Sequence, residues 1–400
     1  MEKPILSEQE KAPLNAGFVA AFGTAPDRYF SAPGRTELSG NHTDHQRGRV
    51  LAGAVNLDMR AAVRKNGTNT IRILSKGYPL TTVMLNLLTP VAEEENTTPA
   101  LVRGVAARFV QLGCKVEGFD AYVESTVLPG SGLSSSAAFE VLVGTIINHL
   151  FFDGKVSQPE IAMIGQYAEN VFFGKPCGLM DQTASAVGGM VTIDFADKEN
   201  PVICPVEFDF AACGHALCII DTRASHADLT DEYAAITREL KSICAYFGKE
   251  VLREISEADF YAAIPALREQ CGDRAVMRAI HFYEENERVP KQVAALQAGD
   301  FDSYLQLMCQ SGLSSYTALQ NVVPTGAVAE QDVAIALALC KRYLNGRGGY
   351  RVHGGGFAGT VQAFVPFDIL DSFRAGIDAV LGDGACHVLS IRPHGGVEVQ

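Results

Sequence analysis

The sequence is short of basic residues: 33 Lys and Arg stand against 46 Asp and Glu, which gives a formal net charge of −13 at pH 7. Non-specific binding to nucleic acid or to an anionic membrane surface needs a basic face, so we expect neither partner. The longest apolar stretch, residues 141–152, is too short to span a bilayer and contains Asn148 and His149. A small anionic substrate is still compatible with this charge where Arg, Lys and backbone N–H groups cluster.

Two patterns based on cysteine and histidine are also missing. The ten cysteines include no C-x-x-C pair, and the sequence contains no H-E-x-x-H motif. Scattered cysteines are typical of buried thiols in a reducing compartment rather than of a disulfide framework. The segment after Met1 is acidic and polar and does not have the pattern of a signal peptide. We therefore expect a cytoplasmic protein.

Length and periodicity predict a mixed, two-domain architecture. Four hundred residues are too many for one ordinary hydrophobic core, so a domain boundary is expected near residue 200. The composition, 47% apolar and 20% charged, is that of a globular protein. Helical and strand-like segments are both present. Asn66-Gly67 is a hairpin signal between strands at 59–63 and 70–74, and Asp181 falls in a glycine-flanked bend.

A loop of glycine and serine lies between an expected strand at 119–127 and an expected helix at 139–151. Such a loop directs backbone N–H groups and the positive end of the helix dipole at one place, which suits phosphate. The P-loop lysine and the dinucleotide G-x-G-x-x-G pattern are both absent. A helix packing closely on a strand would also use small residues. The extent and place of this loop favour phosphate binding by Gly130, Ser131, Gly132, Leu133, Ser134, Ser135 and Ser136.

Residues 32–45 combine Arg, Glu, Asn, Asp and two His with glycines. This mixture adds nothing to a core, but bent backbone with convergent polar side chains suits a small hydroxyl-rich or charged ligand. His42, Asp44 and His45 also resemble a fragment of a zinc-hydrolase site. Such a site usually carries a further His two positions before the first, where this chain has Gly40. We therefore favour hydrogen bonds to substrate hydroxyls over zinc.

A second glycine loop and two acids complete the candidate site. Residues 353–360 place three consecutive glycines between apolar strands, which is destabilising unless the backbone must approach something closely. A β-bulge is the structural alternative, but two glycine loops in one chain favour a nucleotide. Of Asp181 and Glu169, one is a candidate base and the other a candidate Mg²⁺ ligand. Their structural alternative is an N-cap Asp and a solvated helix Glu.

Taken in order, residues 34–45, 128–138 and 354–359 resemble the motifs of the GHMP small-molecule kinase family. Within that family the first segment is most similar to the galactokinases, whose signature reads roughly G-R-x-N-L-I-G-E-H-T-D-Y. Residues 177–182 (Cys-Gly-Leu-Met-Asp-Gln) are also close to the galactokinase version. The resemblance covers nearly the whole chain.

The resemblance implies an α+β, two-domain GHMP kinase fold. Residues 1–200 are then a ribosomal-S5-like α/β domain that binds sugar and phosphate, and residues 201–400 are a ferredoxin-like GHMP domain. It implies ATP-dependent phosphorylation of the C1 hydroxyl of galactose, with ATP and Mg²⁺ as cofactors. A monomer or weak homo-oligomer is expected, with only the sugar and ATP as partners.

The resemblance also implies roles for individual residues. Asp181 is the proton acceptor and Arg35 its cationic partner. The Gly130 to Ser136 loop holds the phosphates, and Ser135 or Ser136 holds Mg²⁺ together with Glu169. The sugar-contacting positions are Asn41, His42, Asp44, Gly178 and Tyr233.

Departures from the galactokinase signature keep the substrate open. The family's Glu before His42 is Asn41 here, and its Asn-Leu-Ile is Glu37-Leu38-Ser39. An amide tolerates a C6 carboxylate that a Glu would repel, and plant galacturonokinases also lack this Glu. Galacturonokinase, or another GHMP sugar-1-kinase, is therefore the main alternative, and Asn41→Glu is expected to favour galactose. A non-catalytic galactose sensor is disfavoured because the serine loop and Asp181 are present.

Overall fold

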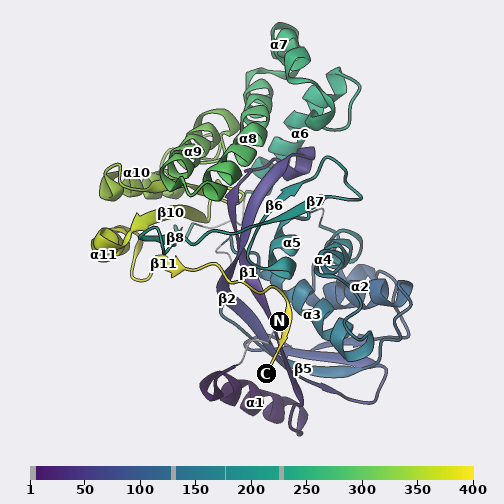
Figure 1. The fold of residues 1–400 in the computed structure, drawn as a ribbon. Helices are drawn as coiled ribbons and strands as arrows, with labels where there is room; N and C mark the ends of the chain where they lie inside the picture. The colour runs from purple at the N-terminus through teal and green to yellow at the C-terminus, as the bar shows by residue number, and fades with distance from the viewer. Residues whose placement is uncertain (1–5, 128–131, 176, 225–228) are drawn as a thin grey trace.

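The computed structural model describes residues 6–127, 132–175, 177–224 and 229–400. Within these residues the strands form a sheet of eight and a sheet of four. In Figure 1 the long strands β1 and β2 run through the middle of the molecule, with α2 to α5 beside them and α6 to α9 toward their upper end, while α10 lies beside β10. None of the described helices is long and apolar enough to cross a membrane.

The longer elements have the following bounds. The helices are α1 (Glu8–Phe22), α2 (Thr98–Gln111), α3 (Ser135–Phe151), α4 (Gln158–Tyr167), α5 (Met180–Val187), α6 (Thr230–Tyr246), α7 (Glu257–Cys271), α8 (Asp273–Gln297), α9 (Phe301–Ser314), α10 (Asp332–Leu344) and α11 (Leu370–Leu381). The strands are β1 (Arg28–Ser39), β2 (Arg49–Lys65), β3 (Thr70–Ser75), β4 (Thr81–Met84), β5 (Phe119–Ser125), β6 (Met190–Asp194), β7 (Val202–Val206), β8 (His215–Asp221), β9 (Gly349–His353), β10 (Thr360–Pro366), β11 (Cys386–Leu389) and β12 (Val397–Val399).

Strand β1 carries most of the first motif. It pairs antiparallel with β2, and the register shifts between Pro33 and Arg35 and again between Glu37 and Ser39. Such irregularities bend a strand and change the direction of its side chains. The motif is therefore an irregular strand up to Ser39.

The small sheet is buried on both faces. Its order is β11-β8-β10-β9. Along β8, Cys218 and Ile220 pack with α10 and α11, while Leu217 and Ile219 join the large core that includes α8 and α9. Because successive strand residues point to opposite faces, this alternation ties the small sheet to the main core.

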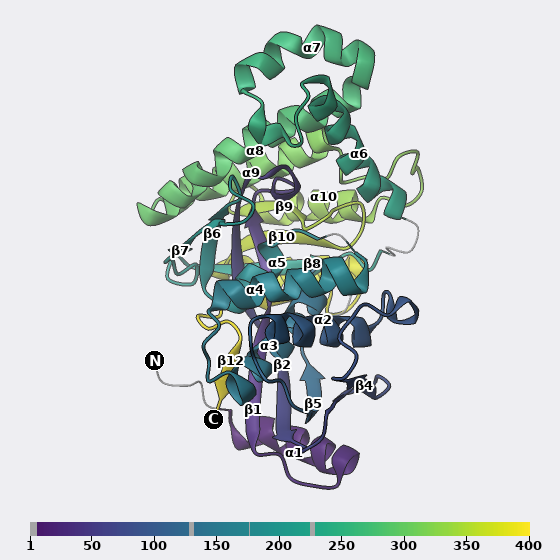
Figure 2. The same cartoon turned by 90° about the vertical axis from the view of Figure 1, so that its right-hand side faces the viewer.

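The domain boundary near residue 200 stays a prediction. The pairing of strands shows that the large sheet contains segments from both sides of residue 200. Strand β7, after residue 200, pairs with β6 in the large sheet, and the last strand, β12, pairs with β1. Figure 2 shows β12 beside the lower part of β1. The C-terminal end of the chain thus returns to the sheet that the N-terminal part builds.

The prediction of a hairpin at Asn66-Gly67 is wrong. Strand β2 pairs with β5, and β3 pairs parallel with β5 and antiparallel with β4. Strand β5 therefore separates the two strands that the turn connects. The Asn66 side chain donates to the carbonyl oxygen of Thr70 at 3.0 Å and to Asp120 Oδ1 on β5 at 2.8 Å. A local turn signal does not reveal that a distant strand will insert.

Candidate active site

The three motifs of the sequence meet at one place. Arg35 donates its backbone N–H to the carbonyl oxygen of Leu133 at 3.0 Å, which joins the first motif to the phosphate loop. Gly132 of that loop has φ +70°, and a Cβ there would lie 2.9 Å from Thr360 Oγ1 and 3.3 Å from His353 Nδ1. Glycine therefore suits this junction with the third motif both by its conformation and by its size.

Arg35 and Asp181 form a bidentate ion pair. Arg35 Nε lies 2.7 Å from Asp181 Oδ1, and Arg35 Nη2 lies 2.7 Å from Oδ2. Ser134 Oγ donates to the same Oδ2 at 2.7 Å. Burial alone would raise the pKa of Asp181, but Arg35 and then Ser134 outweigh it, so the pKa lies below its usual value. Asp181 is thus ionised at neutral pH and fixed beside the phosphate loop.

The bend expected at Asp181 is in fact the start of a helix. Asp181 is the second residue of α5, and Leu179 is the N-cap. A carboxylate in the first turn is stabilised by the positive end of the helix dipole. The glycine at 178 and the shortness of α5 concealed this helix from sequence periodicity.

The phosphate loop leads directly into α3. Gly130 and Ser131 lie outside the described residues. Ser134 precedes the helix with φ 57°, a left-handed conformation that residues other than glycine rarely adopt. The helix begins at Ser135, and Ser135 and Ser136 are half-buried in its first turn. The N–H groups that lack partners at a helix start suit phosphate oxygens.

His42 and Tyr233, which are among the predicted sugar residues, both contact the second glycine loop. His42 Nε2 lies 3.0 Å from the carbonyl oxygen of Gly355, and the Tyr233 hydroxyl donates to the carbonyl oxygen of Gly356 at 2.8 Å. A carbonyl oxygen can only accept, so the proton of His42 is on Nε2. In the neutral ring Nδ1 is then an acceptor.

Asp44 and Gly178, the other predicted pair, also lie together. A Cβ on Gly178 would lie 2.1 Å from Asp44 Oδ2, so no larger residue fits without moving the carboxylate. Asp44 Oδ1 accepts the backbone N–H of His45 at 2.9 Å. His45 is exposed, with its ring centroid 6.3 Å from that of His42.

Asn41 is fully buried, with 0% of its surface exposed. Its Nδ2 donates to Glu37 Oε1 at 3.1 Å and to the carbonyl oxygen of Gly354 at 2.7 Å. Its Oδ1 accepts from Asn321 Nδ2 at 2.9 Å and from Ser315 Oγ at 3.2 Å. Both N–H groups and both lone pairs are therefore engaged within the protein. A direct sugar contact by Asn41 stays a prediction, and its observed contacts tie the second glycine loop to the first motif.

Sequence reasoning missed the buried ion pair beside Asn41. Arg351, on β9, donates to the Glu37 carboxylate although the two residues are 314 positions apart. Burial raises the pKa of Glu37 more than the Arg351 charge lowers it. The neighbouring His353 accepts the Glu37 backbone N–H at Nε2, 3.3 Å away, and bonds to Thr360 through Nδ1 at 2.8 Å. Glu37 stood out in the sequence only as a departure from the family signature, and nothing there named its partner.

Glu169 lies in a π-helical turn, Ala168–Phe173, directly after α4. Such turns often occur at functional sites. The carboxylate is buried: Gln182 Nε2 donates to Oε2 at 2.9 Å, and Lys175 Nζ lies 3.9 Å from Oε1. Burial raises the pKa of Glu169. Like the hydroxyls of Ser135 and Ser136, this carboxylate offers oxygen donors, the donor type that Mg²⁺ prefers.

The half-buried His42 makes the protein sensitive to acid. Burial lowers the pKa of His42 to about 4, whereas a histidine in an unfolded chain titrates near pH 6.5. Between these values the unfolded chain binds a proton that the folded chain does not, so stability falls as pH falls from about 6.5 to about 4. We expect His42→Gln to recover about 2 kcal/mol of the stability lost between pH 7 and pH 4.5.

Urea unfolding at the two pH values measures this effect. Burial also lowers the pKa of His281 and His353, so the variant should keep part of the acid sensitivity. If His42→Gln loses as much stability between pH 7 and pH 4.5 as the wild type does, proton uptake by His42 on unfolding is not a cause of the acid sensitivity.

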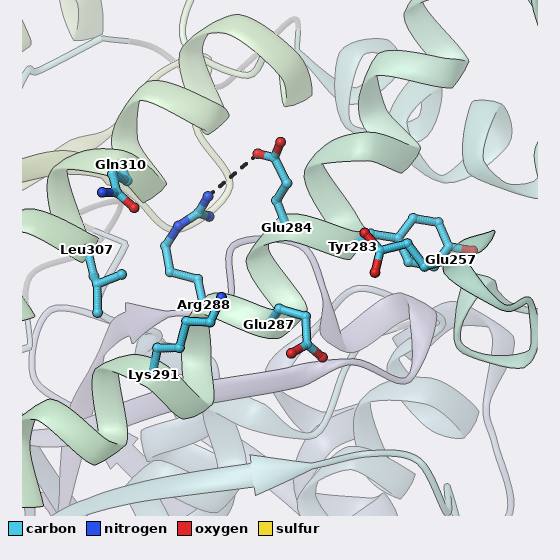
Figure 3. A pocket seen from close by; sticks show the side chains of 8 residues that line it. All are labelled: Glu257, Tyr283, Glu284, Glu287, Arg288, Lys291, Leu307 and Gln310. Carbon is cyan, nitrogen blue, oxygen red and sulfur yellow. Dashed lines mark ion pairs between the residues drawn. The ribbon is translucent and has the colours of Figure 1, made fainter. Parts of the chain in front are cut away.

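A separate pocket of about 310 Å³ opens on the helical layer (Figure 3). Its lining includes Glu284, Arg288 and Lys291 of α8 and Leu307 and Gln310 of α9. Arg288 Nη2 lies 3.6 Å from Glu284 Oε2, as the dashed line marks. None of the motif residues that the structure describes lines this pocket, so we place the candidate active site at the junction of the motifs.

Comparison with known proteins agrees with this geometry. The model described as "Galactokinase galactose-binding signature" matches residues 16–65, and the model "GHMP kinases N terminal domain" matches residues 100–189. The galactokinase of Streptomyces coelicolor is 32% identical over 363 residues, which cover 91% of this chain and 89% of the relative. The galactokinase of Actinobacillus pleuropneumoniae serotype 3 is 32% identical over 359 residues, which cover 89% and 90% of the two chains.

Solved structures confirm the expected GHMP kinase fold. The structure of Lactococcus lactis galactokinase complexed with galactose superposes with a TM-score of 0.83 at 23% identity, covering 97% of this chain and 99% of that one. Methanococcus jannaschii mevalonate kinase gives a TM-score of 0.63 at 14% identity, covering 91% and 98%. The sequence identities, the two family models and the fold together place this chain in the galactokinase family of GHMP kinases.

Proposed function

We propose that the protein transfers the γ-phosphoryl group of ATP to the C1 hydroxyl of galactose. The observation that carries the proposal is the contact of Ser134, at the end of the phosphate loop, with the ionised Arg35–Asp181 pair. A phosphate group at that loop and a sugar hydroxyl at Asp181 would be neighbours. Phosphoryl transfer depends mainly on such positioning and on neutralising charge.

Each partner in this pair has a defined task. Asp181 accepts a hydrogen bond from the C1 hydroxyl and takes its proton as the oxygen attacks phosphorus. Arg35 keeps the carboxylate ionised and stabilises the negative charge on the phosphoryl oxygens. The N–H groups at the start of α3 and the loop from Gly130 to Ser136 bind the phosphates of ATP.

We assign Mg²⁺ to Glu169 and to one of Ser135 and Ser136. The ion neutralises and orients the phosphate oxygens when it is bound. When no Mg²⁺ is bound, the Lys175 ammonium group, 3.9 Å from Glu169 Oε1, balances the charge of this carboxylate. The assignment is supported by the oxygen-only donor set and by the burial of Glu169.

The sugar hydroxyls are assigned to His42 Nδ1, the Asp44 carboxylate, the backbone of Gly178 and the Tyr233 hydroxyl. Asn41 belongs to the same region, but its polar atoms already have partners. The Asn41 N–H groups are therefore not available to a C6 carboxylate of the substrate. This removes the reason for expecting galacturonate, so we favour galactose as the substrate. A monomer or weak homo-oligomer in the cytoplasm suits the acidic charge and the unpaired cysteines.

An ADP-release assay tests the proposed reaction. We expect the wild-type protein with ATP and Mg²⁺ to release ADP with galactose, and far less with galacturonate, N-acetylgalactosamine, arabinose or mevalonate. Faster ADP release with galacturonate than with galactose would identify galacturonate as the substrate. No release with any sugar, alongside galactose binding by calorimetry, would identify a sensor instead of an enzyme.

A further inference from the structure

A second buried carboxyl group, that of Glu140, shares a hydrogen-bond partner with Glu169 and has no assigned part in phosphoryl transfer. Glu140, in the second turn of α3, is 1% exposed. Gln182, next to Asp181 on α5, donates its Nε2 to Glu140 Oε2 at 3.0 Å and to Glu169 Oε2 at 2.9 Å. One amide group therefore bridges two buried carboxyl groups that come from different helices.

The surrounding helices leave room for this cluster. Gly165 of α4 faces it: a Cβ at that position would lie 3.0 Å from Glu140 Oε2 and 3.2 Å from Gln182 Cγ. A buried carboxyl group is unfavourable unless its contacts offset the lost hydration. The fold thus accommodates Glu140 at a position where an apolar residue would pack more readily.

Two atoms of the cluster have no partner among the described residues. Glu140 Oε1 and Gln182 Oε1 are both buried without a hydrogen bond. Burial and the nearby Glu169 charge raise the pKa of Glu140 well above its usual value. A neutral Glu140 carries a hydroxyl donor, while its other oxygen still accepts the Gln182 amide. Two ionised carboxylates around a single amide would instead repel each other.

We propose that Glu140 is a positioning residue: it holds the Gln182 amide, and Gln182 holds the Glu169 carboxylate in the orientation that receives Mg²⁺. The inference rests on the proposed kinase function for the role of Glu169. Residues that orient a metal ligand typically change metal affinity 10–100-fold when they are replaced. Gln182 also follows Asp181 directly, so the same contact fixes the start of α5.

Binding of Mn²⁺ to the protein–ADP complex, measured by electron paramagnetic resonance, tests this role without any turnover. We expect Glu140→Leu to weaken Mn²⁺ binding about tenfold or more, while the thermal shift caused by galactose is unchanged. Glu140→Gln, which keeps an oxygen acceptor for the Gln182 amide, should recover most of the lost affinity. Gln182→Met breaks the bridge from the other side and should weaken Mn²⁺ binding to a similar extent.

Leu142→Ala is the matched control, because it opens a cavity in the core face of the same helix. We expect it to lower the melting temperature without changing Mn²⁺ affinity. The proposal is overturned if Gln182→Met or a folded Glu140→Leu protein binds Mn²⁺ as the wild type does, or if Leu142→Ala weakens binding equally. Failure of the wild type to phosphorylate galactose would refute the kinase assignment separately, since the Mn²⁺ measurement does not depend on the sugar.

Discussion

Asp181→Ala is expected to reduce phosphorylation of galactose by at least ~10²–10⁴-fold, the usual contribution of a general base, while the protein still binds ATP. The variant removes the group that accepts the proton and that orients the C1 hydroxyl. It removes the Ser134–Asp181 hydrogen bond, but the Arg35 backbone contact with Leu133 does not involve Asp181 and still joins the phosphate loop to β1. Single-turnover kinetics and calorimetric titration with ATP measure the two properties separately.

Stability has to be measured together with activity. Removing Asp181 leaves the buried Arg35 guanidinium without its carboxylate, and because Asp181 itself is partly exposed, the cost should lie below the about 3–5 kcal/mol of a fully buried pair. Asp181→Asn keeps the shape and one acceptor oxygen and should fold better, yet it should be nearly as inactive because an amide does not take up the proton. A folded Asp181→Asn protein that turns over at the wild-type rate would refute the assigned base.

Asp194→Asn is a suitable control for this pair. Asp194 is likewise paired with arginine, 2.8 Å from Arg49 and 3.0 Å from Arg253, but none of the three belongs to the motif junction. Its ion pairs are partly exposed, and such pairs contribute about 0–1 kcal/mol. We expect Asp194→Asn to keep full activity, so a loss of activity at Asp181 reflects its position and not the loss of any carboxylate.

The sequence predicted the parts of the site that repeat a family pattern. Arg35 and Asp181 are 146 positions apart, yet their motifs and order identified them as partners, and they form an ion pair. Predictions that rested on local signals were less reliable. Asn66-Gly67 indicated a hairpin, but strand β5 inserts between the two strands. Strand insertion depends on packing across the whole sheet, which a window of a few residues does not contain.

The hydrogen bonds that position the site residues could not be predicted for a related reason. Gln182 belongs to a recognised motif, but its bridge between Glu140 and Glu169 exists only because α3, α4 and α5 pack together. The partners of Asn41 likewise come from distant segments, at residues 315, 321 and 354. A hydrogen-bond partner is a property of the packed structure, and a single sequence gives residue types but not their neighbours.

The acid and the amide of the first motif have exchanged places relative to the galactokinase signature, and this exchange yields the second large prediction. Asn41→Glu puts a carboxylate where Nδ2 now lies 3.1 Å from Glu37 Oε1. It also removes the N–H group that bonds to the carbonyl oxygen of Gly354. Two buried carboxylates would then share Arg351, so we expect a loss of about 3–5 kcal/mol of folding stability.

The double variant Glu37→Asn/Asn41→Glu restores one acid and one amide beside Arg351, in the order of the family signature. Residues that share one polar network typically couple by about 0.5–3 kcal/mol, so we expect the double variant to be more stable than Asn41→Glu alone. Urea unfolding of the four proteins of this cycle measures the coupling. Additive effects of the two single substitutions, which is a coupling energy of zero, would mean that Glu37 and Asn41 do not share a network.

The folded double variant also decides what position 41 does for the substrate. The sequence led us to expect that a Glu at this position favours galactose over galacturonate. The structure changes that expectation, because all four hydrogen-bonding positions of Asn41 are used inside the protein. We now expect the ratio of kcat/KM for galactose and galacturonate to stay unchanged in the double variant. A shift towards galactose would show that the side chain at 41 reaches the sugar, because only a carboxylate near C6 would repel the galacturonate charge.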